Sequence, residues 1–114
     1  MTLTYPNQPI ETYTRRFNQV IMITYDLKTP GQNYQGLDEA IKSLGNYWHY
    51  LGSTWLVDTT HTTKQVRDYL KQFIDYNDRL LVTKVDPSDV SGWLPEKAWN
   101  WIYKRRRRVA NILR

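Results

Sequence analysis

The chain contains no cysteine, which excludes disulfide bonds and thiol chemistry. Its two histidines, His49 and His61, are too few for a classical zinc site, whose ligands are mostly cysteine and histidine. No apolar run reaches the roughly 18 residues that a membrane-spanning helix requires, and no signal-peptide pattern opens the sequence. The 114 residues suffice for one domain with a modest core. We therefore expect a cytoplasmic protein with no membrane partner.

Basic residues are concentrated at the C-terminal end of the sequence. The formal net charge is +5, yet residues 20–99 carry eight Lys and Arg against ten Asp and Glu, a net charge of −2. Residues 1–19 add +1 and residues 100–114 add +6. Such a basic run is either a solvated tail or a nucleic-acid contact, because lysine and arginine neutralise phosphates. The candidate nucleic-acid contacts in the expected basic tail, residues 103–114, are Lys104, Arg105, Arg106, Arg107 and Arg108.

The periodicity of apolar residues predicts the order β-α-β-β-α-β within residues 20–102. Short β-rich runs bounded by turn residues predict strands, and apolar residues spaced three and four apart predict amphipathic helices. This order is the ferredoxin-like arrangement, an α+β fold with a four-stranded antiparallel sheet and both helices on one face. Residues 1–19 show neither period and are expected to form an extended or disordered lead-in. The expected strands are 20–27, 47–51, 54–58 and 79–85, and the expected helices are 37–44 and 62–74.

Large side chains lie on both faces of the hairpin expected at residues 47–58. The second face of the sheet must therefore be covered by a partner, a ligand or a terminal segment. A short helix is expected to begin near Pro95 and to dock against the sheet edge or a partner subunit through Trp93, Trp99, Trp101 and Ile102. Homodimerisation through the second face is the leading interpretation.

Asp26 is the most informative single residue, because it is a carboxylate at the end of an apolar strand. Burying such a group is costly unless it is paired, hydrogen-bonded or bound to a cation. It either holds a metal and takes part in catalysis or caps the loop that follows it. Asp58, at the end of the third strand, is interpreted as a turn former. His49 is interpreted as a surface or dimer-face residue, and Ser53 as a hairpin residue.

Two segments together resemble a known family. They are Ile23-Thr24-Tyr25-Asp26-Leu27 in the first strand and Ser53-Thr54-Trp55-Leu56-Val57 in the third. With the ferredoxin-like order, they make residues 20–102 similar to the CRISPR-associated Cas-two endoribonucleases and the virulence-associated protein D toxins. Within that superfamily, the chain looks most like the small stand-alone proteins described as SinR-like.

The resemblance implies a homodimer in which Asp26 approaches its symmetry mate. Two facing carboxylates share a proton or hold a divalent cation, here Mg²⁺ or Mn²⁺. Such an ion would activate water for phosphodiester cleavage. Family members are either metal-dependent nucleases or structural, duplex-binding partners of an integrase. The family commonly has a basic cluster after this strand, whereas here only Lys28 follows as a further candidate nucleic-acid contact.

Two hypotheses of different classes therefore stand. In the first, the protein is a nucleic-acid-binding homodimer that acts on RNA or DNA, with Asp26 as catalytic residue and metal ligand of an endoribonuclease. In the second, it is a non-enzymatic dimeric module for a nucleotide ligand or a protein partner, in phage defence or counter-defence. The fold transfers from the resemblance more safely than the chemistry does.

Overall fold

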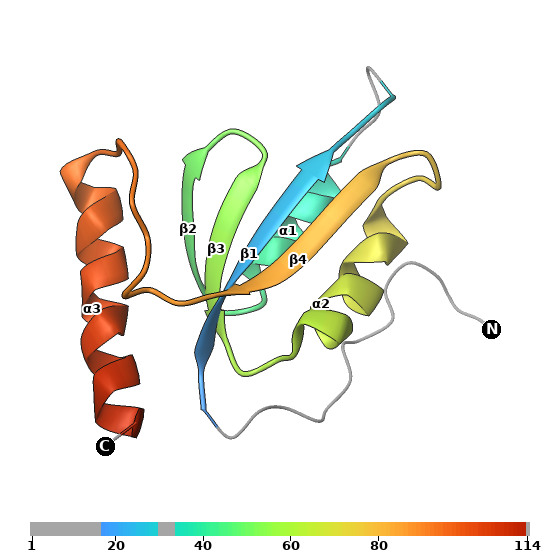
Figure 1. Ribbon diagram of the computed structural model, residues 1–114. Coiled ribbons are helices and arrows are strands. Elements are labelled where there is room, and N and C mark those ends of the chain that lie inside the picture. Colours follow the sequence, from blue (N-terminus) through green and yellow to red (C-terminus); the bar gives the residue numbers. More distant parts are fainter. Residues whose placement is uncertain (1–16, 30–33, 114) are drawn as a thin grey trace.

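The computed structural model describes residues 17–29 and 34–113, with side chains through residue 106. The lead-in expected at residues 1–19 lies mostly outside these ranges. The described chain forms four strands and three α-helices (Figure 1). A single 3₁₀ turn, η1, spans Lys71–Phe73. In chain order the elements are β1 (Gln19–Asp26), α1 (Gln35–Lys42), β2 (Asn46–Leu51), β3 (Thr54–Thr59), α2 (Thr63–Leu70), β4 (Arg79–Val85) and α3 (Glu96–Leu113).

The four strands form one antiparallel sheet in the order β2-β3-β1-β4. This strand order, with helices after β1 and β3, confirms the predicted α+β fold of ferredoxin-like type. Strand β1 is central and has a partner strand on each side, and its residues Val20, Ile21 and Ile23 are buried. None of the described helices has the length and apolarity needed to cross a membrane.

Helices α1 and α2 cover the first face of the sheet (Figure 1). Ile21 and Ile23 of β1 are fully buried there, together with Leu37 and Ile41 of α1. Each such side chain contributes about 1.5–3 kcal/mol when it is removed from water. Helix α2 begins with a capping box, in which Thr62 Oγ1 accepts from the Gln65 N–H and the Gln65 side chain accepts from the Thr62 N–H.

Helix α3 covers part of the second face of the sheet. Val20, Trp48 and Leu56 on the sheet form a buried cluster with Ala98 and Ile102 of α3. The indole N–H of Trp48 donates to the Ala98 carbonyl oxygen at 3.2 Å. The sequence predicted that a partner, a ligand or a terminal segment covers this face. In the part that is covered, the terminal segment α3 does so.

The last helix is longer than the sequence predicted. We expected a short helix near Pro95 and a separate basic tail over residues 103–114, but α3 continues as one element from Glu96 to Leu113. Arginine and lysine are good helix formers, so the basic run does not interrupt the helix. The basic residues thus belong to a helix, and the N-terminal half of this helix packs against the sheet.

Gly45 positions the loop that leads from α1 into β2. A Cβ atom at this residue would lie 2.1 Å from the Asp58 carbonyl oxygen, far inside van der Waals contact. Only glycine allows the two backbones to approach so closely. This approach holds the end of β3, and with it Asp58, next to the start of β2.

Candidate functional site

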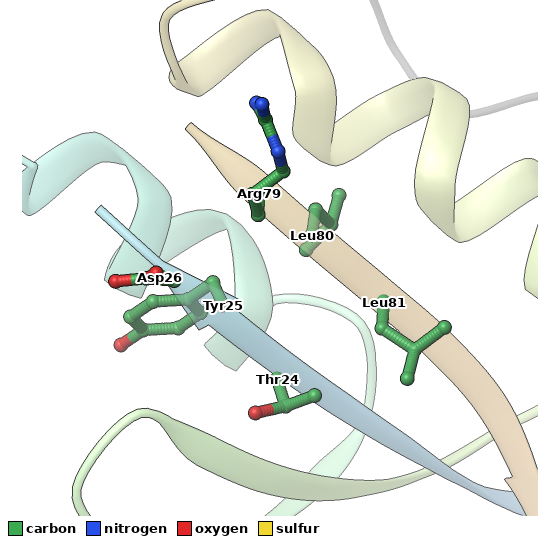
Figure 2. Close-up of a pocket in the computed structure, with 6 residues that line it drawn as sticks. All are labelled: Thr24, Tyr25, Asp26, Arg79, Leu80 and Leu81. Atoms are coloured by element: carbon green, nitrogen blue, oxygen red, sulfur yellow. The ribbon is translucent and has the colours of Figure 1, made fainter. Parts of the chain in front are cut away.

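Asp26 lies at the exposed end of β1, beside the last described residues before the loop. Its side chain is 64% exposed and forms an ion pair with Lys28 Nζ. Its cross-strand neighbour in β4 is Arg79. The two residues line a shallow depression of about 220 Å³ together with Thr24, Tyr25, Leu80 and Leu81 (Figure 2). The Arg79 guanidinium is directed at its own loop, where it donates to the carbonyl oxygens of Asn77 and Asp78, both at 3.1 Å.

Sequence analysis missed one buried carboxylate, Asp78, which binds Lys28 just after β1 and Tyr34 just before α1. It is 6% exposed and accepts from the backbone N–H groups of Lys28 and Asp75, both at 2.8 Å. The Tyr34 hydroxyl lies 3.2 Å from each of its oxygens. Burial raises the pKa of Asp78, but these hydrogen bonds to the charged form outweigh burial and lower it below the usual value. The ionised carboxylate therefore joins the segments before α1 and before β4.

Tyr25, the residue before Asp26 in β1, packs on the first face of the sheet. Its hydroxyl accepts from the Trp55 indole N–H at 3.2 Å. Burial raises the pKa of Tyr25, and the Asp38 carboxylate raises it further, while the Trp55 hydrogen bond acts in the opposite direction. His49 stacks on Trp55 with ring centroids 3.6 Å apart, and its Nε2 lies 2.7 Å from the Gly52 carbonyl oxygen. These contacts keep His49 on the surface, as expected.

The Asp26 region does not fit a divalent cation well. Across the described residues, no three His, Asp or Glu side chains are grouped closely enough to hold a metal. Each chain offers one carboxylate, Asp26, which is already in contact with the Lys28 ammonium and has Arg79 as its neighbour. A second copy would bring its own lysine and arginine as well. These surroundings do not favour the magnesium or manganese site that the resemblance implies, and we derive no catalytic step from it.

Arg105, expected to contact nucleic acid, is instead bound inside the fold. Its Nε lies 3.0 Å from Asp58 Oδ2, and the side chains are 11% and 6% exposed. Its Nη1 donates to the Trp101 carbonyl oxygen at 3.0 Å, and its guanidinium carbon lies 3.7 Å from the centre of the Trp101 ring. The expectation that Asp58 forms a turn was wrong, since Asp58 pairs with Val20 and with Asn46 inside the sheet. We call this contact the Asp58–Arg105 ion pair.

Of the other basic residues of α3, Arg106 binds within the fold and Lys104 lies on the surface. Arg106 Nε donates to the Pro87 carbonyl oxygen at 2.6 Å and its guanidinium covers the Tyr103 ring, so it fastens the connector between β4 and α3. Lys104 is exposed. The side chains of Arg107 and Arg108 lie outside the described part of the structure. Lys28 is paired with Asp26, so its predicted contact with nucleic acid competes with that ion pair.

Helix α3 leaves half of the second face uncovered. Thr24 pairs with Leu81 and with Thr54, and Met22 pairs with Thr83 in the register of β1. Leu81 is 58% exposed and Leu51 is 48% exposed, although both belong to strands. We call this surface the open half of the second face; its residues are Met22, Thr24, Leu51, Thr54, Leu81 and Thr83.

No protein-family model matches the chain. The fold and the site define a small α+β protein of ferredoxin-like topology, with a basic helix packed on one half of the second face of its sheet. The similarity to the Cas-two and virulence-associated protein D superfamily stays a prediction.

The Asp58–Arg105 ion pair predicts unequal roles for two neighbouring basic residues. Arg105→Gln removes a charged partner from the buried Asp58 carboxylate, so it should lower the free energy of unfolding by about 3–5 kcal/mol. Lys104→Gln, at the adjacent exposed position, should leave it nearly unchanged. Urea denaturation of the two variants measures this difference. Equal stabilities would mean that Arg105 belongs to a solvated tail.

The surroundings of Asp26 predict that magnesium does not bind there. Adding millimolar magnesium should change the Tm of the wild type and of Asp26→Asn by the same amount, because the Lys28 ammonium already contacts the carboxylate. Differential scanning fluorimetry with both proteins provides the comparison. An increase in Tm that is specific to the wild type, or RNA cleavage that Asp26→Asn abolishes, would establish the metal site.

Proposed function

We propose that the protein is a homodimer that binds nucleic acid through its C-terminal helix. The dimer would form through the open half of the second face. The observation that carries this proposal is the exposure of Leu81, an apolar residue at the middle of a strand, beside a helix that covers only the other half of the same face. Large apolar side chains that stay exposed on the uncovered half of a sheet face mark a candidate interaction site.

A second copy suits this surface because the open half is self-complementary. A two-fold axis through it would pack the same residues of each chain against one another, as in most homodimers. Leu81 on β4 and Leu51 on β2 would supply apolar contacts at the two edges of this surface, with Thr24 and Thr54 on the central strands between them. Thr24 and Thr54 already satisfy one another at 3.0 Å, so their burial costs little. Asp26 and Arg79 would lie at the end of this interface.

The charge of α3 supports nucleic acid as the partner. The helix carries six basic residues and one acidic residue, whereas residues 20–99 are slightly acidic. Arg105 and Arg106 are taken up by contacts within the fold, so Lys97, Lys104 and positions 107 and 108 remain as candidates. Positions 97, 104 and 108 are spaced by seven and four residues, which places them along one side of a helix. Such a line of cations suits a phosphate backbone.

The alternative of a nucleotide-binding module has less support. The depression beside Asp26 is small and shallow, and its carboxylate would repel the phosphates of a nucleotide. The proposal assigns no metal-dependent cleavage to Asp26, because the Lys28 ammonium already contacts this carboxylate.

The dimer is tested by placing a charge at Leu81. Leu81→Lys should convert the dimer into a monomer at micromolar concentration, because a charged lysine would replace an apolar side chain inside the interface. Tyr76→Lys is the matched control, since Tyr76 is 99% exposed on the loop before β4, away from the second face. Sedimentation velocity distinguishes the two states. A wild type that sediments as a monomer would contradict the dimer.

The nucleic-acid contact is tested by removing charge from α3 without shortening it. Lys104→Gln combined with Arg108→Gln should weaken binding to duplex DNA or RNA and reduce its salt dependence, since each lost phosphate contact lowers the slope by about 0.9 on B-DNA. Fluorescence anisotropy at several salt concentrations measures both effects.

The matched control for this test removes two cations from the other side of the sheet. Lys64 and Lys71 have side chains that are 74% and 63% exposed, on α2 and the following turn. Lys64→Gln combined with Lys71→Gln changes the net charge by the same amount. Equal losses of affinity for the two double variants would show that only net charge matters and that α3 is not the contact surface.

A further inference from the structure

Trp93 is the most exposed of the large apolar residues near the second face of the sheet. It lies on the connector between β4 and α3 and is 100% exposed. Its neighbours on the connector, Val90 and Leu94, pack against the buried cluster under α3. The connector is also fastened by Arg106, whose Nε donates to the Pro87 carbonyl oxygen. The chain is therefore anchored on both sides of Trp93 while the indole itself stays in water.

An apolar groove lies next to Trp93, between the connector, α3 and the sheet. It has a volume of about 470 Å³. Met22 and Leu56 of the sheet and Ile102 of α3 line it, with Leu94 on the connector side. Asp89 lies at its edge and offers an acceptor for an indole N–H. Trp93 borders the groove, but because it is fully exposed it does not fill it.

We propose that Trp93 of each copy inserts into this groove of the other copy and is the main anchor of the dimer. This inference rests on the proposed homodimer and specifies how it is held together. Trp93 and the groove lie on the same side of one chain, so a single two-fold axis can bring each Trp93 to the groove of the other chain. Met22 and Leu51 belong both to the groove lining and to the open half, which makes the two surfaces continuous.

The size of the side chain favours this occupant. Two inserted tryptophans would bury about 300–500 Å² of their own surface, against the roughly 1,000 Å² that a stable interface needs. The exposed apolar residues of the open half would supply the rest. Tryptophan is also among the residue types that most often dominate binding energy at the centre of an interface.

The experiment is the dimer dissociation constant of Trp93→Ala, measured by sedimentation equilibrium. The variant should raise the dissociation constant by at least about 30-fold, the size expected for an interface hot spot. Its circular dichroism spectrum and its Tm at a concentration where it is monomeric should match those of the monomeric Leu81→Lys variant. Tyr76→Ala, which removes another fully exposed aromatic residue, should leave the dissociation constant unchanged.

The outcomes separate this inference from the proposed function. If the wild type dimerises, Leu81→Lys is monomeric and Trp93→Ala dimerises as tightly as the wild type, the anchor is overturned and the proposed dimer stands. If the wild type is itself a monomer, both are overturned. A 30-fold or larger loss in Trp93→Ala, with no loss in Tyr76→Ala, supports the insertion of Trp93.

Discussion

The ion pair between Asp58 and Arg105 decides how the C-terminal helix sits on the sheet. Both groups are nearly inaccessible to solvent, so each charge needs compensation inside the protein, and the ion pair contributes to it. The apolar contact of α3 with the sheet is made by the buried Ala98 and Ile102 and by the partly buried Trp99 and Trp101. A pair of buried charges is more demanding in geometry than apolar packing. It therefore fixes one position of α3 among those that apolar packing alone would allow.

Two consequences follow from that position. The helix covers the half of the second face that contains Val20, Trp48 and Leu56, and it leaves the half around Leu81 in water. The basic run is also divided, because Arg105 and Arg106 hold the fold together while Lys104 remains on the surface. The surface proposed for the second copy and the cations proposed for nucleic acid are thus defined by the same contact.

Much of the fold could be predicted from the sequence, because its signals are local. The apolar run before Asp26 and the spacing of Leu37, Ala40, Ile41 and Leu44 each indicate one element without information from elsewhere in the chain. The capping of α2 at Thr62 is equally local, because it joins Thr62 to Gln65. The order of these elements then restricts the topology to the ferredoxin-like arrangement that the structure has.

The site could be predicted less well, because its contacts join distant parts of the chain. Arg105 and Asp58 are 47 residues apart, so the sequence around Arg105 does not show its partner. Without that partner, the basic run after the expected short helix is interpreted as a tail. Asp78 binds the backbone of Lys28 across 50 residues, and nothing near it in the sequence indicates that role. Asp26 attracted attention as a carboxylate at a strand end, yet the feature that characterises it is its contact with Lys28.

Amide hydrogen exchange of the wild type at low and high salt tests the central claim most directly, namely that the basic run is a docked helix held by a buried ion pair. The amides of residues 104–106 should be protected to an extent comparable with those of residues 100–102, which follow the first turn of α3. Their protection should persist at 1 M salt, because buried charges are screened far less than exposed ones. Exchange of these amides at the rate of an unstructured chain, at either salt concentration, would contradict the account.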